Sequence, residues 1–137
     1  MSFVWQEYLE LARDLLAPSP NAAQVEARLR CAISRAYYAA FCTARNHLSD
    51  RERHRIPRLR AHQYVRDRFL SSEPVRQRIG TKLDEWRIKR NKVDYDEVVL
   101  DDEGSPADLS KLAQDAVQDL HDVIQAIRRL ASQADSG

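Results

Sequence analysis

Glycine, proline and long apolar runs are scarce in this chain of 137 residues. Three glycines and five prolines, beside 43% hydrophobic and 31% charged residues, indicate a folded helical protein rather than a disordered one. The length suits a single domain, which we expect to span residues 1–137. Because no apolar run approaches the length of a membrane span, we expect no membrane partner.

Cysteine is also rare, and the N-terminus carries no targeting pattern. Cys31 and Cys42 lie on one predicted helix, too far apart along it to reach each other, so we expect no internal disulfide. The first seven residues lack a basic region followed by an apolar block, so we expect no signal peptide. Both features favour a cytoplasmic location.

Several motifs that carry chemistry are missing as well. The chain has no glycine-rich phosphate loop, no nucleophile-elbow pattern and no basic region preceding a zipper. Its histidines are scattered, at His47, His54, His62 and His121, and no pair of histidines or cysteines has metal-ligand spacing. We therefore expect neither a metal nor a cofactor.

The net charge of +1 conceals a strong asymmetry along the chain. Residues 51–92 carry fourteen Lys or Arg against five Asp or Glu, a net charge of +9, whereas residues 93–137 carry three against eleven, a net charge of −8. Two interpretations stay open. The segments are either neighbouring solvated faces of opposite sign, or a basic surface that attracts phosphate, with the acidic segment shaping or masking it.

Apolar residues recur at three- and four-residue spacing through most of the chain, and no stretch alternates as a strand would. Capping residues and prolines then place five helices. The first begins after Ser2 and ends before Pro18 and Pro20, the second runs from Asn21 to about Leu48, a short one spans about 58–70, the fourth begins at Ser72 and ends near Val93, and the last begins at Ser105. The sequence therefore predicts an all-α fold, an up-and-down bundle of four long helices and one short helix.

One apolar stripe on the fourth helix ends in an arginine. Val75, Ile79, Leu83 and Trp86 recur at four, four and three residues, and Arg90 takes the next position on that side. Burying an unpaired guanidinium is costly. Arg90 therefore needs a carboxylate, a partner chain or an anionic ligand.

Two interpretations of the Arg90 cluster stay open. Asp94 lies four residues further on and can pair with Arg90 if the helix continues, which would make the cluster structural. Alternatively, Arg90 holds a phosphate while Asn91 and Tyr95 supply hydrogen bonds, and these three are the candidate catalytic residues.

A second arginine lies on the second helix, whose middle, residues 31–44, is apolar on almost every side and therefore central. Arg35 and Tyr38 belong either to core packing with one paired arginine or to a ligand-binding network. In one alternative, Arg35 pairs with Asp94 across helices and frees Arg90. His62 follows a very basic run, and with nothing nearby in the sequence to orient it we expect a surface histidine.

At these two clusters the chain resembles the HEPN family, named for higher eukaryotes and prokaryotes nucleotide-binding. Residues 35–41 are similar to the second-helix motif of small prokaryotic HEPN proteins, and residues 90–96 to the end of their late helix. The resemblance covers about residues 5–130. It implies a helical bundle, usually a homodimer, and in many members a metal-independent ribonuclease of toxin–antitoxin or defence systems. Some members are encoded beside a minimal nucleotidyltransferase that neutralises them.

The resemblance implies less about catalysis than about fold. Active members carry an arginine, often followed by a polar residue, and then, after four to six further positions, a histidine. Arg90 and Asn91 match the first half, but Tyr95 stands where the nearest histidine is expected, and none lies between Arg90 and His121. We therefore expect a non-catalytic or weakly active component that binds RNA or a nucleotide and pairs with a minimal nucleotidyltransferase. The alternative is an active ribonuclease toxin with an atypical motif.

The apolar stripes also predict an assembly. The last helix and the Trp86 stripe carry more apolar surface than a small bundle needs to bury. We therefore expect a two-fold homodimer.

Overall fold

The computed structural model describes residues 3–19 and 21–136, and it is helical throughout these ranges apart from connecting segments. Its elements are α1 (Gln6–Leu15), the 3₁₀ turn η1 (Ala22–Gln24), α2 (Val25–Asp50), α3 (Ala61–Phe69), α4 (Pro74–Tyr95) and α5 (Leu109–Ser136). No strand occurs in the described ranges, so the prediction of an all-α bundle is confirmed.

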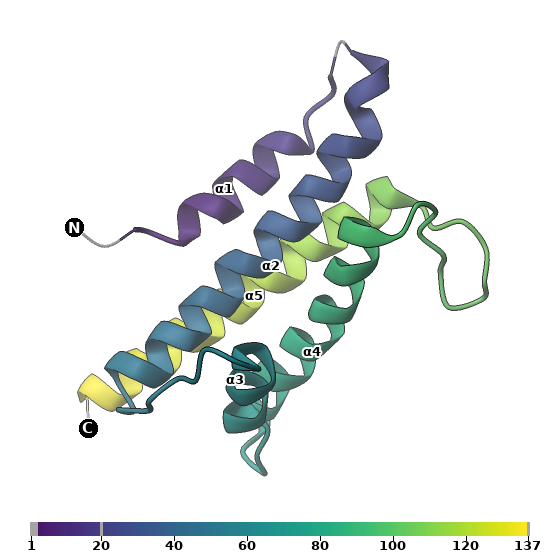
Figure 1. Cartoon of the computed structure of the whole chain (residues 1–137). Coiled ribbons are helices and arrows are strands. Elements are labelled where there is room, and N and C mark those ends of the chain that lie inside the picture. The colour runs from purple at the N-terminus through teal and green to yellow at the C-terminus, as the bar shows by residue number, and fades with distance from the viewer. Residues whose placement is uncertain (1–2, 20, 137) are drawn as a thin grey trace.

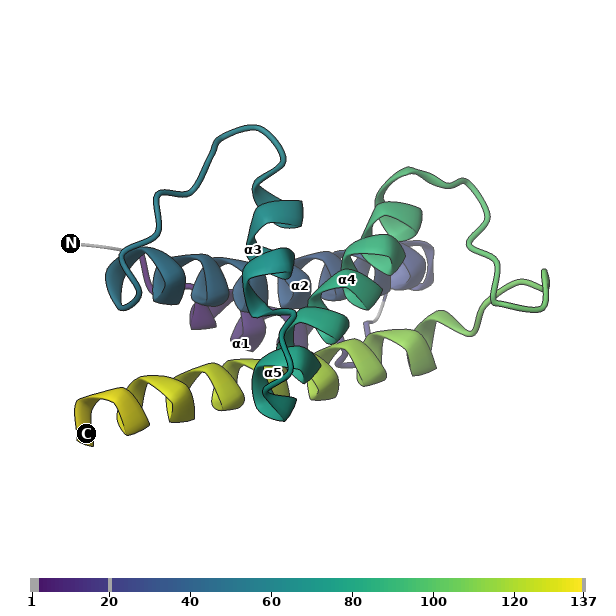
Figure 2. The ribbon, with the colours of Figure 1, turned by 90° about the horizontal axis from the view of Figure 1, so that it is seen from below.

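Helices α1, α2, α4 and α5 run alternately up and down, but α1, with 10 residues, is almost as short as α3, with 9, so three helices are long and not the four expected. Figure 1 shows α2 and α5 lying side by side and running in the same direction, with α1 along α2 and α4 crossing the pair at an angle. Figure 2 gives the same arrangement from below and shows α3 beside the first half of α4. The loop between α4 and α5 projects from the end of α4 that lies away from α3.

The core forms around α2, as expected for the most apolar helix. Ile33, Ala36, Ala40 and Leu48 have no exposed surface, and the alanines among them allow α1, α4 and α5 to approach closely. The expectation that residues 31–44 are dry on almost every side needs correction. Cys31 is exposed, and Arg35 and Tyr38 are only half-buried.

The starts of α4 and α5 differ from the sequence expectation. Helix α4 begins at Pro74 rather than Ser72, because the Glu73 side chain accepts hydrogen bonds from the backbone N–H groups of Val75 and Arg76 and so forms the cap. Helix α5 begins at Leu109 rather than at Ser105, because the Asp108 carboxylate accepts from the N–H of Lys111.

The starts of α3 and α2 also differ from the sequence expectation. The short helix starts at Ala61, after Arg60 in a left-handed conformation (φ 58°). Asn21 caps the 3₁₀ turn that leads into α2, with its side chain accepting from Ala23. The expected cap Ser2, and Pro20, lie outside the described residues.

Gly80 sets how closely α3 approaches α4. A Cβ atom at this position would lie 2.9 Å from the Leu70 side chain and 3.1 Å from the Arg66 carbonyl oxygen. The absence of a side chain at Gly80 therefore allows the end of α3 to pack directly on α4. An ion pair of 3.0 Å between Arg66 and Asp84 joins the same two helices.

The apolar stripe of α4 is used inside the chain. Ile79, Leu83 and Trp86 are at most 2% exposed, and the Trp86 indole donates a hydrogen bond to Asp119 of α5. The stripe of α5 is likewise buried, with Leu120 and Ile124 fully covered. The argument for a homodimer from these two stripes is therefore wrong, because the monomer buries them.

The structure also bears on the expectations about membrane-spanning helices and about the two cysteines. Within residues 3–19 and 21–136, no helix is long and apolar enough to cross a membrane. Cys31 and Cys42 are both free, the first exposed and the second buried.

A polar network fixes the basic connector, residues 51–60, which leads from α2 to α3. Glu52 accepts two hydrogen bonds from Arg76 of α4, at 2.6 and 3.1 Å, and lies 2.9 Å from Nε2 of the buried His47. Partial burial raises the pKa of Glu52, but the hydrogen bonds and charges of Arg76 and His47 outweigh burial and lower it below its usual value.

Replacing Glu52 should test this anchor. Glu52→Ala leaves Arg76 and His47 without their shared acceptor, and we expect it to destabilise the fold by about 1–3 kcal/mol in denaturant unfolding at pH 7. Because the folded-state pKa is depressed, the contribution is present above the usual pKa of 4.5 and is lost as the pH falls through the folded value.

The matched control is Glu10→Ala, which removes an exposed pair with Arg13 and should cost at most about 0.5 kcal/mol. An equal loss in both variants, or a loss at Glu52 that does not diminish in acid, would contradict the anchor.

Candidate functional site

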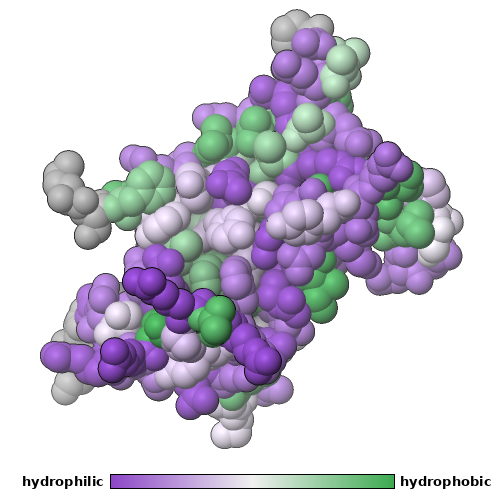
Figure 3. Space-filling view, viewed as in Figure 1, coloured by the Kyte–Doolittle hydropathy of each residue, from purple (hydrophilic) through white to green (hydrophobic). Residues whose placement is uncertain are grey.

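A groove between α3 and α4 gathers most of the candidate residues. It has a volume of about 500 Å³ and is lined by Arg60, His62, Gln63, Arg66, Arg87, Arg90 and Asn91, which together we call the arginine groove. No Asp or Glu belongs to this lining among the residues that the structure describes. Hydrophilic side chains dominate the face of the molecule seen in Figure 3.

Arg90 is the most buried charge in the groove and is incompletely paired. Its residue is 8% exposed, and its Nε has no hydrogen-bond partner in the described chain. The ion pair with Asp94, anticipated from the spacing of four residues, forms at a long Nη1–Oδ2 distance of 3.4 Å. Asp94 also accepts a hydrogen bond of 3.4 Å from Ser34. An arginine this buried has unused capacity to donate hydrogen bonds.

Two tyrosines of α2 support the Arg90 guanidinium. Its carbon lies 5.4 Å from the ring centroid of Tyr37 and 5.1 Å from that of Tyr38. Arg35 also packs on aromatic rings. Its guanidinium carbon lies 5.3 Å from the Tyr38 centroid and 4.9 Å from that of Tyr8. Stacking on aromatic rings stabilises a partly dehydrated cation without using its N–H donors.

His62 is brought beside Arg90 by the fold. Its Nδ1 shares a hydrogen bond of 2.6 Å with the Tyr37 hydroxyl, and its ring stacks on Phe41 at 4.0 Å. The expectation of a surface histidine with nothing to orient it is therefore wrong. The orienting groups lie on α2, which a search near residue 62 in the sequence cannot find.

Burial and charge make this histidine neutral. Burial, followed by the charges of Arg90 and Arg87, lowers the pKa of His62 from 6.5 to about 4. Burial raises the pKa of the Tyr37 hydroxyl above its usual value, although Arg90 and Arg87 act against this. At pH 7 both partners of the hydrogen bond are therefore uncharged, and the positive charge of the groove resides on its arginines.

Arg66 and Arg87 have acidic partners, whereas Arg60 leaves the groove with an excess of positive charge. Asp84 accepts hydrogen bonds from both Arg66, at 3.0 Å, and Arg87, at 3.3 Å. One carboxylate thus serves two guanidinium groups, with Asp67 as a second partner for Arg66. Arg60, at the start of α3, is exposed and adds a further cation to the lining.

The structure separates the residues that the sequence grouped together. Arg90 and Asn91 share the groove, with Asp94 next to them on α4. Tyr95 lies outside the groove lining and is 79% exposed. Asp94 pairs with Arg90, so the proposed Arg35–Asp94 pair is wrong; Arg35 instead packs on two tyrosines and donates to Ser34.

Arg87 of the groove and Tyr37 beside it were not among the site residues that the sequence analysis named. Arg87 lies three and four residues before Arg90 and Asn91, so helical periodicity could have placed it on the same side. Tyr37 lies in the segment already singled out, but its role depends on His62, which is 25 residues away. Only the packing of α3 on α2 and α4 brings them together.

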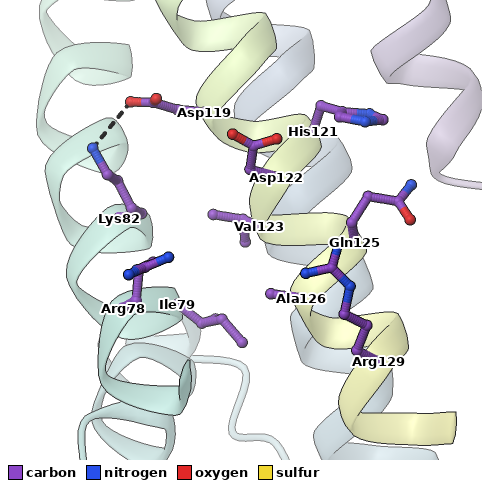
Figure 4. Close-up of a pocket in the computed structure, with 10 residues that line it drawn as sticks. All are labelled: Arg78, Ile79, Lys82, Asp119, His121, Asp122, Val123, Gln125, Ala126 and Arg129. Carbon is purple, nitrogen blue, oxygen red and sulfur yellow. Dashed lines mark hydrogen bonds and ion pairs between the residues drawn. The ribbon is translucent and has the colours of Figure 1, made fainter. Parts of the chain in front are cut away.

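A second hollow, of about 460 Å³, lies between α4 and α5 on another part of the surface. Figure 4 shows Lys82 reaching Asp119 across it, with an ion-pair distance of 3.2 Å. Asp119 is also hydrogen-bonded to the Trp86 indole, and His121 contacts Arg13 at 3.0 Å. Since the Asp119 carboxylate is already satisfied inside the protein by Lys82 and Trp86, this hollow is a weaker candidate than the arginine groove.

Across the part of the chain that the structure describes, no three His, Cys, Asp or Glu side chains are grouped to hold a metal ion.

Comparison of the chain with family models, with curated proteins and with solved structures found no match. The functional argument therefore depends on the site itself.

The unusual environment of His62 can be measured directly. In a titration followed by NMR, its ring should titrate at about pH 4. Arg87→Gln should raise this midpoint, because the Arg87 charge opposes protonation of His62. Arg78→Gln removes a cation outside the groove and should leave the midpoint unchanged. A His62 midpoint near its usual 6.5 would contradict the neutral, buried environment.

Proposed function

We propose that this chain binds the phosphate groups of RNA or of a nucleotide in the arginine groove, and that it does so with little or no cleavage. The observation that carries the proposal is Arg90, a buried guanidinium whose Nε has no partner and whose ion pair is 3.4 Å long. A phosphate in the groove would give this guanidinium a stronger acceptor than its long ion pair does. Arginine suits this task, because its planar fork matches the geometry of phosphate.

The surroundings of Arg90 support the same chemistry. Three further arginines line the groove, and the basic connector adds Arg51, Arg53, Arg55 and Arg58 beside it in the chain. Such a concentration of positive charge attracts polyanions over a distance and holds them through release of counterions. The resemblance to HEPN proteins favours RNA or a nucleotide among the phosphate ligands.

The environment of His62 favours binding over catalysis. Cleavage of RNA without a metal requires groups that move protons at the 2′-hydroxyl and at the leaving oxygen. His62 has the position for this role, beside Arg90 and oriented by Tyr37. With a pKa of about 4, however, it is a weak base at pH 7. The alternative function is a ribonuclease in which His62, and not Tyr95, is the proton-transfer group.

The wider system follows from the resemblance as part of this proposal. We place the chain in a two-component toxin–antitoxin or defence system, acting in the cytoplasm beside a minimal nucleotidyltransferase. A gene for such an enzyme next to the gene for this chain would support the pairing, and its absence would count against it.

Binding should depend on salt and on the groove. Fluorescence anisotropy with a short labelled RNA should show that the logarithm of the binding constant falls linearly with the logarithm of salt concentration. Arg87→Gln should weaken binding and reduce this slope by about one, since one phosphate contact is lost.

Arg129→Gln removes the same charge from α5, outside the groove, and is the matched control. Equal weakening by both variants would show that RNA binding depends on general surface charge and not on the arginine groove. No binding of wild type at low salt would refute the proposal.

Catalysis is tested separately. Purified protein incubated with mixed cellular RNA in excess chelator at pH 7 should give little or no cleavage, because the groove lacks a group that exchanges protons readily at that pH. Cleavage that is lost in both His62→Ala and Arg90→Lys, but kept in Tyr95→Phe, would establish the ribonuclease alternative.

A further inference from the structure

A row of aromatic rings and arginines continues from the arginine groove to α1. On the groove side, the ring centroid of Tyr38 lies 5.1 Å from the guanidinium carbon of Arg90 and 6.2 Å from the ring centroid of His62. The guanidinium of Arg35 then joins two helices, because it packs on Tyr38 of α2 and on Tyr8 of α1. A continuous series of side-chain contacts therefore connects the groove with the N-terminal helix.

The row ends in a cluster of three aromatic rings at the start of α1. The ring centroids of Phe3 and Trp5 lie 4.8 Å apart. The Tyr8 centroid lies 5.2 Å from that of Phe3 and 5.5 Å from that of Trp5. Phe3 is 48% exposed, and Trp5 and Tyr8 are half-buried. These rings therefore keep part of their surface open to solvent.

The arginines of this row have no acidic partner. Arg45 of α2 lies over the Trp5 ring, with its guanidinium carbon 5.4 Å from the centroid, and donates to Asn46 at 3.2 Å. Arg35 donates to Ser34 at 3.3 Å. Among the residues that the structure describes, neither arginine forms an ion pair with an Asp or Glu. Since a guanidinium carries five N–H donors, most of these donors stay available for an anionic ligand.

The fold leaves this row partly uncovered. Helices α1 and α4 both pack on α2 but, within residues 3–19 and 21–136, not on each other, and Figure 1 shows them on opposite sides of α2. Arg35, Tyr38 and Arg45 follow one another on α2 after three and seven residues, which places them on one side of that helix. We call the row the aromatic platform. Its members are Phe3, Trp5, Tyr8, Arg35, Tyr38 and Arg45.

Aromatic rings interleaved with arginines match the chemistry of a single-stranded nucleic acid. An unpaired base stacks on an aromatic ring or on a guanidinium plane, and the phosphates between the bases bind cationic donors. A duplex keeps its base faces inside its own stack, so that such rings gain little from it. The aromatic platform supplies both kinds of contact, and the arginine groove beside it supplies further cations.

We propose that the aromatic platform holds unpaired bases of a single-stranded RNA whose phosphates bind in the arginine groove. The inference rests on the proposed function, because the strand that reaches the platform is the one held at Arg90. It narrows the ligand to a strand of several unpaired nucleotides, since a single nucleotide in the groove does not also reach α1. Phe3 and Trp5 then determine the preference for unpaired over paired RNA.

Three ligands of equal length test the base contacts. In fluorescence anisotropy at one salt concentration, single-stranded RNA should bind several-fold more tightly than the fully paired duplex, although the duplex has the higher charge density. An abasic strand, which keeps the phosphates but has no bases, should also bind several-fold more weakly than the RNA. Binding of the duplex or of the abasic strand as tight as that of single-stranded RNA would overturn the platform.

Replacement of the rings tests which residues make these contacts. Phe3→Leu and Trp5→Leu keep an apolar side chain and remove the ring, so each should weaken binding of single-stranded RNA about tenfold and leave binding of the abasic strand unchanged. The matched control, Leu11→Ala, shortens an exposed side chain of the same helix and should alter neither affinity. Equal losses for both ligands in the ring variants would indicate a structural role and overturn the platform.

Tryptophan fluorescence provides a second measurement on the unaltered protein. The chain has two tryptophans, and Trp86 is only 1% exposed, so a base can stack only on Trp5. Single-stranded RNA should quench the fluorescence of wild type, the abasic strand should not, and Trp5→Leu should abolish the quenching. No quenching at saturating RNA, or quenching by an acidic peptide but not by RNA, would overturn the platform.

The same titrations distinguish failure of the platform from failure of the proposed function. Equal binding of all three ligands that is weakened by Arg87→Gln, but not by loss of the rings, would keep the phosphate site and overturn the platform. Absence of binding of any of the three ligands at low salt would refute the proposed function itself, and the platform with it.

Discussion

The burial of Arg90 against α2 is the constraint on which the site depends. The apolar stripe of α4 carries this guanidinium into the position where a further core residue would otherwise lie, and the rings of Tyr37 and Tyr38 receive it. Taking a cation out of water is costly unless its donors are satisfied. Asp94 satisfies this need only in part, at 3.4 Å, and Nε remains without an acceptor. The fold therefore keeps a buried donor without an acceptor on a guanidinium that lines the arginine groove.

The positive charge of the arginine groove helps to keep His62 neutral. Burial and the charges of Arg90 and Arg87 keep His62 unprotonated, while Tyr37 fixes its ring. An anion in the groove would oppose the effect of both arginines and raise the pKa of His62 from about 4. Binding of phosphate and protonation of His62 would then assist each other. This linkage explains how one site can favour binding while it retains the parts of a catalyst.

The sequence predicts the helices better than it predicts the site. Helical periodicity identifies all five helices, and the spacing of Arg90 and Asp94 anticipates their ion pair. The starts of α4 and α5 were misplaced because the carboxylates of Glu73 and Asp108, and not the side chains of Ser72 and Ser105, accept the first backbone N–H groups. His62 was missed because its partners lie on another helix, and their proximity depends on the packing permitted by Gly80. Helical periodicity identifies the apolar side of α4 that carries Trp86, but not the element that covers it. The burial of this stripe within the monomer could therefore not be predicted from the sequence.

The central claim concerns one guanidinium, and it can be followed by NMR of the arginine Nε–H groups. Among the residues that the structure describes, Arg90 and Arg28 have a buried Nε without a hydrogen-bond partner, and of these two Arg90 lines the arginine groove. Addition of a short RNA should shift the Nε–H resonance of Arg90, because a phosphate bound to its guanidinium changes the charge around that group, while the resonance of Arg28 stays in place. An unchanged Arg90 resonance under conditions where the RNA is bound would contradict the account.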